Sequence, residues 1–116
     1  MRRTLFTLVL LLISTISFSQ KMKESYYEKL FASIIHGQTE VVLKDKSRVD
    51  IVTDTFAIEV DFAEKWAESV GQSLYYAQEM DKKPGVLLII EGRKDDIYLN
   101  RLMIMAFKYN IRVMSC

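Results

Sequence analysis

The spacing of apolar residues along the first half of the chain predicts one helix followed by three strands. Residues 23–37 (KESYYEKLFASIIHG) carry apolar side chains at helical intervals, and a glycine ends the pattern. Residues 39–45 predict a short strand, and residues 48–53 and 55–60 alternate apolar and polar positions. These last two segments therefore predict a β-hairpin with a tight turn at Asp54 and Thr55.

The second half of the chain predicts helix, strand, helix and strand. The helical period returns over residues 62–80, where Phe62 opens the buried face, and residues 84–92 (PGVLLIIEG) form an apolar run typical of a strand buried on both faces. Residues 96–110 predict a helix and residues 111–115 a final strand. The order αβββαβαβ favours an α/β fold, a mixed central sheet flanked by helices, in one small domain.

The register of the predicted hairpin follows from its apolar positions. One face is apolar throughout if Ile51 lies opposite Ile58 and Val49 lies opposite Val60. A slip of one residue would turn every one of these side chains to the other face. We therefore expect this register.

In this register the other face of the hairpin is acidic. Asp50 lies opposite Glu59, and Arg48 lies opposite Asp61. Side chains directly opposed on a hairpin have Cβ atoms about 4.5–5.5 Å apart, so two carboxylates there repel each other. A divalent cation such as Mg²⁺ reverses the sign of this interaction, because it binds converging carboxylate oxygens. The acids therefore predict a metal site, and a solvated face on which they splay apart is the alternative.

Two more acidic residues are candidates for the same site. Glu40 heads the preceding predicted strand and offers a third carboxylate. Asp61 either binds the metal or caps the following helix, since Asp61 and Glu64 have the spacing of a capping box. Both interpretations of Asp61 stay open on the sequence.

The predicted helix after the hairpin carries a polar stripe. Lys65, Gln72 and Tyr76 lie on one side of it at helical spacing. Lys65 is one turn into the helix and within reach of the acids, where an ammonium group would steady a developing negative charge. Alternatively, it forms an ordinary solvated ion pair with Glu64 or Glu68.

The first 19 residues predict a cleavable signal peptide. A basic start (Arg2, Arg3) precedes an apolar run over residues 5–16, and Ser17-Phe18-Ser19 supplies a cleavage site before Gln20. The apolar run is shorter than the roughly 20 residues that span a bilayer. We expect residues 20–116 to be a single domain that is secreted or periplasmic and keeps no membrane anchor.

The charge balance gives no general support for nucleic-acid binding. The chain holds 16 Lys+Arg and 15 Asp+Glu, and removal of Arg2 and Arg3 leaves 14 against 15, a formal charge of −1. Binding to nucleic acid would then need a local basic patch or bound cations. The candidates for such a patch serve equally well as turn residues: Lys44, Lys46, Arg48, Lys82 and Lys83.

The chain resembles the PD-(D/E)xK nuclease-like superfamily, and in particular short exported domains of that kind. The resemblance covers nearly all of residues 20–116, including RVDIVTDTFAIEVDFAEKWAESVGQSLYYA and KKPGVLLIIEG. It implies a restriction-endonuclease-like αβββαβ core followed by a further helix and strand. Asp50 matches the metal-binding acid of the second strand, Glu59 the first acid of the (D/E)xK element, and Glu40 an upstream glutamate.

The chain departs from the family pattern at one position. The element reads Glu59-Val60-Asp61, so that Asp61 stands where the family has its lysine. The resemblance makes Lys65 the candidate for a lysine relocated to the helix. It also matches Gln72 and Tyr76 to the QxxxY element of exonuclease-like branches.

The resemblance implies a hydrolase that cleaves nucleic acid, most simply DNA, with Mg²⁺ or Mn²⁺. Asp50 and Glu59 would hold the metal, Lys65 would stabilise the transition state, and Gln72, Tyr76 and Arg48 would orient the substrate. An inactive binding module with the same fold is the alternative, which Asp61 favours. A homodimer formed through residues 98–109 (YLNRLMIMAFKY) is a third hypothesis, although their apolar stripe is also explained as core.

Overall fold

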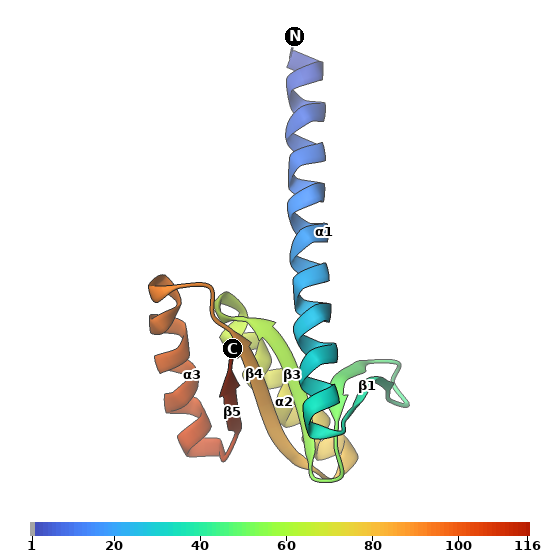
Figure 1. Cartoon of the computed structure of the whole chain (residues 1–116), viewed down its shortest axis with the longest axis vertical. Helices are drawn as coiled ribbons and strands as arrows, with labels where there is room; N and C mark the ends of the chain where they lie inside the picture. The colour runs from blue at the N-terminus through green and yellow to red at the C-terminus, as the bar shows by residue number, and fades with distance from the viewer. Residues whose placement is uncertain (1) are drawn as a thin grey trace.

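The computed structural model describes residues 2–116, and among the first 18 residues it describes the side chains of residues 9–13 and 15. Helices and strands follow one another in the predicted order (Figure 1). The helices are α1 (Arg2–Ile35), α2 (Trp66–Met80) and α3 (Asp96–Tyr109), with the 3₁₀ turns η1 (Ala63–Lys65) and η2 (Arg93–Asp95) before α2 and α3. The strands are β1 (Gln38–Val42), β2 (Arg48–Val52), β3 (Phe56–Phe62), β4 (Lys83–Ile89) and β5 (Arg112–Ser115).

The strands form one mixed sheet in the order β1-β2-β3-β4-β5. β1, β2 and β3 pair antiparallel, whereas β4 and β5 join them in parallel through crossovers that contain α2 and α3. α1 covers one face of the sheet, and α2 and α3 cover the other (Figure 1). The predicted α/β fold with a mixed central sheet flanked by helices is therefore confirmed.

The apolar run in β4 is explained by cover on both of its faces. Leu87 and Ile89 pack in the layer under α1, whereas Val86 and Leu88 pack under α2 and α3. All four side chains are buried. A strand in this position needs an apolar residue at every position, because neither face meets water.

The β2–β3 hairpin has the predicted register, because Ile51 pairs with Ile58. Its turn closes with a hydrogen bond of 2.9 Å from the N–H of Thr53 to the carbonyl oxygen of Phe56. Among the described residues, β2–β3 pairing covers Ile51–Ile58 and the adjacent pair toward the turn. Beyond Ile51 and Ile58 the two strands separate, and this separation shapes the candidate site.

Two predictions at the junction of β3 and α2 are wrong. Phe62, predicted to open a helix, is the last residue of β3 and pairs with Ile89. Asp61 lies inside the strand, and neither η1 nor α2 has a side-chain cap among the described residues, so Asp61 and Glu64 form no capping box. Parallel pairing with β4 holds this segment extended, and tertiary pairing overrides a local helical spacing.

α1 is much longer than the helix predicted over residues 23–37. It begins at Arg2 and includes residues 2–19 of the predicted signal peptide, among which residues 9–13 have exposed side chains. Met1 and the side chains of Arg2, Arg3, Ser17 and Phe18, on which the leader prediction rests, lie outside the described residues. Within the described part of the chain, no helix is long and apolar enough to cross a membrane.

Candidate functional site

Side chains replace the backbone pairing where β2 and β3 separate. The N–H of Val60 donates to Oδ2 of Asp50 at 2.8 Å, and the N–H of Asp50 donates to Oε1 of Glu59 at 3.4 Å. Each carboxylate thus bonds the backbone of the other strand. Glu59 is only 4% exposed. The predicted proximity of Asp50 and Glu59 is present, although they face each other across a gap in the ladder.

Glu40 and Glu28 complete a close group of acids with Asp50. Carboxylate oxygens of Glu28, Glu40 and Asp50 all lie within 4.8 Å of one another. Glu40 has a left-handed backbone (φ 53°) between the β1–β2 pairs Thr39–Ile51 and Val41–Val49. This distortion occurs at the position opposite Asp50. The prediction that Glu40 lies near Asp50 is met by the geometry.

Glu28 is the member of this group that the sequence interpretation missed. It comes from α1, is 5% exposed and points toward the sheet together with Ala32 and Ile35. The spacing from Glu28 to Ala32 and Ile35 is i, i+4 and i+7, which places Glu28 on the buried face of the helix. An acid on that face is unusual and could have been noticed, because buried glutamates are rare unless they are paired.

Burial and mutual repulsion raise the pKa of these acids. Burial, followed by the charge of Asp50, raises the pKa of Glu59 to about 10. Burial, followed by the charges of Asp50 and Glu40, raises the pKa of Glu28 to about 8. The pKa of Asp50 rises to about 6, chiefly through burial.

One more acid on α1 extends the cluster. Burial, followed by the charges of Asp61 and Asp50, raises the pKa of Glu24 to about 7. Among the described residues the only ion pair is Lys23–Glu91, so none of the clustered carboxylates has a basic partner in contact. In the described structure, no basic side chain in contact therefore offsets the burial and repulsion that raise the pKa of these acids.

Asp61 and Lys65 lie at one side of the cluster. Asp61 is 7% exposed and accepts a hydrogen bond of 2.6 Å from the hydroxyl of Ser69 on α2. Burial raises the pKa of Asp61, while the Ser69 bond and the positive charge of Lys65 lower it. The same Lys65 charge lowers the pKa of Glu24. Lys65 is therefore close enough to the acids to act on them electrostatically, although it is exposed and forms no ion pair in the described structure.

The other predicted site residues differ in their placement. Tyr76 is buried on α2 rather than on a polar stripe, and its pKa is raised by burial and by the charges of Glu59 and Asp50. Gln72 is half-buried one turn earlier on the same helix. Arg48 is exposed, and the described β2–β3 pairing ends at Ile51 and Ile58, so the predicted pairing of Arg48 with Asp61 is not formed.

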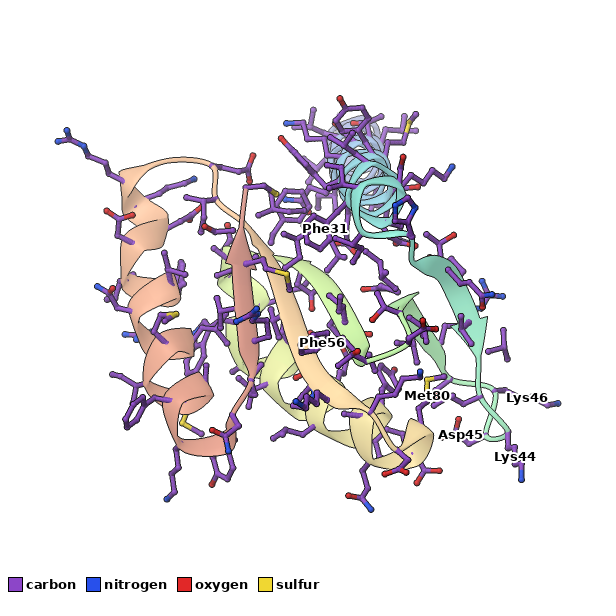
Figure 2. All side chains as sticks on the ribbon, turned by 60° about the horizontal axis from the view of Figure 1, so that its bottom comes forward. Phe31, Lys44, Asp45, Lys46, Phe56 and Met80 are labelled. Atoms are coloured by element: carbon purple, nitrogen blue, oxygen red, sulfur yellow. The ribbon has the colours of Figure 1, made fainter. Side chains whose placement is uncertain are left out.

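The basic residues considered for a nucleic-acid patch fall into two groups. Lys44 and Lys46 project into solvent from the turn between β1 and β2 (Figure 2). Asp45 in that turn accepts hydrogen bonds from Ser47 and from the hydroxyl of Tyr75, which fixes the turn against α2. The ammonium group of Lys82, in contrast, donates to the carbonyl oxygens of Thr53 and Asp54, at 2.7 and 2.9 Å. Lys82 therefore binds the turn between β2 and β3.

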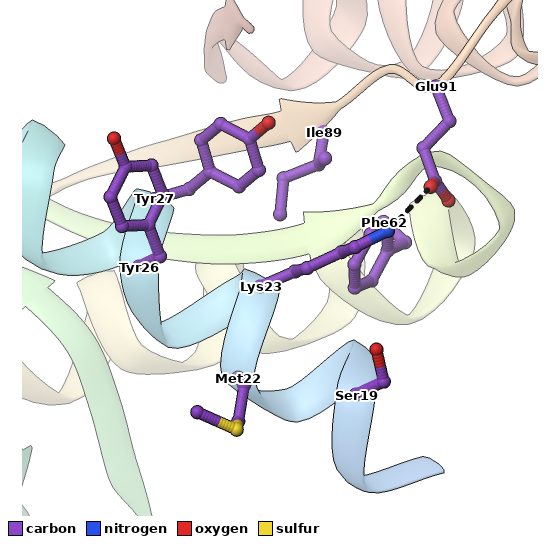
Figure 3. A pocket seen from close by; sticks show the side chains of 8 residues that line it. All are labelled: Ser19, Met22, Lys23, Tyr26, Tyr27, Phe62, Ile89 and Glu91. Atoms are coloured by element: carbon purple, nitrogen blue, oxygen red, sulfur yellow. Dashed lines mark ion pairs between the residues drawn. The ribbon is translucent and has the colours of Figure 1, made fainter. Parts of the chain in front are cut away.

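The hollow in Figure 3 is separate from the acids. It has a volume of about 450 Å³ and lies between α1 and the carboxyl ends of β3 and β4. Lys23 and Glu91 form an ion pair of 3.9 Å across it. Its lining contains no residue of the acidic cluster: Ser19, Met22, Lys23, Tyr26, Tyr27, Phe62, Ile89 and Glu91. The chemistry of the cluster therefore has to be judged from the cluster itself.

Comparison with known proteins adds no relative: no protein-family model, no curated protein and no solved structure matches the chain.

Proposed function

We propose that the chain is a metal-dependent phosphodiester hydrolase that acts on nucleic acid. The observation that carries the proposal is the convergence of Glu28, Glu40 and Asp50 from three different elements, with Glu59 adjoining them. Glu28 is buried, Asp50 is half-buried and Glu40 is exposed. Repulsion from its two neighbours is therefore costly for Glu28 in particular, and a cation that joins the three carboxylates would offset it.

The residues present fit a hard divalent cation. Mg²⁺ binds oxygen ligands at about 2.0–2.1 Å, so that oxygens on opposite sides of the ion are about 4 Å apart. The carboxylate oxygens of Glu28, Glu40 and Asp50 all lie within 4.8 Å of one another, so small shifts of these side chains suffice to bring them around one ion. Oxygen donors alone favour Mg²⁺ or Mn²⁺ over metals that prefer nitrogen or sulfur.

The residues of the chain have distinct tasks in this proposal. Asp50, Glu40 and Glu28 would hold the metal, and a metal held there would supply activation of a water and would offset the charge of the phosphate. Glu59 has a raised pKa and keeps a proton at neutral pH until the metal arrives. Lys65 supplies positive charge at the Asp61 side, where an anionic substrate or transition state needs it.

The proposal is tested by metal binding and cleavage with a matched pair of variants. The purified protein is titrated with Mg²⁺ and Mn²⁺ by calorimetry and incubated with plasmid DNA, single-stranded DNA and RNA. Asp50→Asn should abolish both metal binding and cleavage. Asp54→Asn removes an exposed acid from the same hairpin and should leave both unchanged. Absence of divalent-metal binding by the unaltered protein would overturn the proposal.

A second candidate is a metal-binding module of the same fold without activity. The placement of Asp61 favours it, because this acid stands at the family's lysine position and is held by Ser69. Metal binding that is lost in Asp50→Asn, combined with no cleavage of any of the three substrates, would select this function. If cleavage occurs and Lys65→Ala does not slow it, the role given to Lys65 is wrong while the metal site stands.

A further inference from the structure

A hollow of about 500 Å³ lies where α2 and α3 end and β4 and β5 begin, at the lower end of the molecule in Figure 1. Three of the residues that line it are basic, Lys82, Lys83 and Arg112, and none is acidic. Its volume is within the range of roughly 300–1,000 Å³ that is usual for ligand sites in proteins. We call it the basic hollow.

The sign of its charge distinguishes the basic hollow from three other hollows of the described structure. Each of those is lined by acidic and basic residues together: Lys23 with Glu91, Arg112 with Asp54, and Lys82 with Asp81. The whole chain is also nearly balanced, with 16 Lys+Arg and 15 Asp+Glu. A cavity lined by charges of one sign concentrates the opposite charge, so the basic hollow favours an anionic ligand.

The register of the sheet places Lys83 and Arg112 on one face. Lys83 pairs with Phe56, and Arg112 pairs with Gly85, two residues after Lys83 on β4. Neighbouring strands are about 4.8 Å apart and rise about 3.3 Å per residue, so the Cα atoms of Lys83 and Arg112 lie roughly 8 Å apart. Two long side chains can converge on one phosphate from that separation.

Lys83 and Arg112 are available to an anion. Both are exposed, and in the described part of the chain neither forms an ion pair. The ammonium group of Lys82, in contrast, already donates to two carbonyl oxygens of the β2–β3 turn. Lys82 therefore adds positive charge to the hollow, while Lys83 and Arg112 would contact the ligand.

Capping of helices does not account for these two cations. Basic side chains are common at the C-terminal ends of helices, where they offset the helix dipole. Here the last turn of α2 is closed by the backbone N–H groups of Asp81 and Lys82, and that of α3 by those of Asn110 and Ile111. Lys83 and Arg112 follow these ends and belong to strands.

Two aromatic rings beside the cations indicate a nucleotide. Phe56 and Tyr109 line the hollow, and the Tyr109 side chain is 44% exposed. The ammonium group of Lys108 lies 5.6 Å from the centroid of the Tyr109 ring and adds a fourth positive charge at the rim. Nucleobases stack on aromatic side chains, whereas Lys and Arg bind the phosphates. An acidic peptide would use the cations and leave the rings to water.

We infer that the basic hollow binds one nucleotide unit, with its phosphate on Lys83 and Arg112 and its base against Tyr109. This inference rests on the proposed function for the source of the unit, a strand of nucleic acid, since a free nucleotide has the same chemistry. No residue of the acidic cluster lines the hollow. The hollow would therefore hold the strand at a nucleotide other than the one that is cleaved.

Binding without cleavage tests the inference. Fluorescence anisotropy is measured at low salt with a labelled single-stranded DNA of about 12 nucleotides, in a chelator that prevents metal-dependent cleavage. Arg112→Glu and, separately, Lys83→Glu should weaken binding by about tenfold or more. Lys94→Glu makes the same change of charge at an exposed residue just before α3, and it should bind as the unaltered protein does. Circular dichroism checks that each variant is folded.

Two further variants separate the phosphate from the base. A phosphate contact on a single strand contributes about 0.7 to the slope of log K against log salt, so Arg112→Gln should reduce the slope by about that amount. Tyr109→Ser should weaken binding by about fivefold or more and leave the slope unchanged, because it removes a stacking surface. An affinity that Tyr109→Ser does not alter overturns the assignment to a nucleotide.

The remaining outcomes distinguish this inference from the proposed function. Binding of neither the strand nor adenosine monophosphate, or binding that Arg112→Glu leaves unchanged, overturns the inference even if the protein cleaves DNA. Binding that is lost in Arg112→Glu, by a protein that cleaves nothing with Mg²⁺ or Mn²⁺, supports the hollow and refutes the hydrolase alone. Adenosine monophosphate that binds when the strand does not also supports the hollow and assigns it to free nucleotides.

Discussion

Replacement of Glu59 by glutamine should make the metal-free protein more stable at neutral pH. Burial and the charge of Asp50 raise the pKa of Glu59 from 4.5 to about 10 in the folded state. A carboxyl group with a raised folded pKa contributes most stability below its unfolded pKa and loses that contribution as the pH rises toward the folded value. Glu59 therefore loses its stabilising contribution as the pH rises from 4.5 to about 10.

The size of the effect follows from the distance between the working pH and the unfolded pKa. At pH 7 the unfolded chain has Glu59 ionised, while the folded chain keeps it protonated or holds a charge that burial disfavours. Each pH unit above 4.5 costs about 1.4 kcal/mol, which sets an upper limit of roughly 3.5 kcal/mol at pH 7. Because Asp50 shares the repulsion, we expect the amide to recover about 2 kcal/mol, or roughly 10 °C in Tm for a domain of this size.

Thermal unfolding followed by circular dichroism, in the presence of a chelator, measures this gain between pH 4.5 and 8.5. Glutamine keeps an oxygen that can accept the N–H of Asp50 and does not ionise in either the folded or the unfolded chain. Glu64→Gln is the control, since Glu64 is exposed and its replacement should change stability by less than about 0.5 kcal/mol. The reasoning fails if Glu59→Gln is less stable than the unaltered protein at pH 7. It also fails if the gain does not shrink as the pH falls to 4.5.

Two further predictions concern the metal and the packing of the fold. Mg²⁺ or Mn²⁺ at about 100 times its dissociation constant should stabilise the unaltered protein by about 2.7 kcal/mol, seen as a rise in Tm. The same addition should leave Asp50→Asn unchanged, and an equal rise in this variant would place the metal elsewhere. Gly37→Ala should lower the free energy of unfolding by about 1–3 kcal/mol in a urea titration, because its new Cβ would lie 2.5 Å from Cγ2 of Ile51. Gly71→Ala, in the middle of α2 with open space around it, should instead raise that free energy by about 0.5–1 kcal/mol, and equal losses in both would contradict the packing argument.

The register of the hairpin was predictable from the alternation of apolar and polar residues in its two strands. The predicted pairing of Ile51 with Ile58 is present, and both pack with Val60 under α1. Val49 is buried too, but it packs with Tyr76 and Ala77 of α2, so the prediction that it shares one apolar face with the others is wrong. The proximity of Asp50 followed from that register.

The shape of the site was not predictable in the same way. A period-2 pattern cannot show where two strands separate, and the separation depends on carboxylates that take over backbone hydrogen bonds. Glu28 was missed because α1 reaches the cluster only through tertiary packing. Phe62 was assigned to a helix because its spacing to Trp66 is helical, whereas pairing with Ile89 decides its conformation.

Asp50 and Glu59 accept hydrogen bonds from the backbone, so these two acids have a structural role that is independent of any metal. Were the chain to lose its chemistry during evolution, selection for a closed sheet would still keep both in place. The presence of both acids in a descendant sequence would therefore be weak evidence that the descendant is active. Glu28 and Lys65 hold no backbone group in the described structure, so those two positions would drift first and reveal whether catalysis had been abandoned.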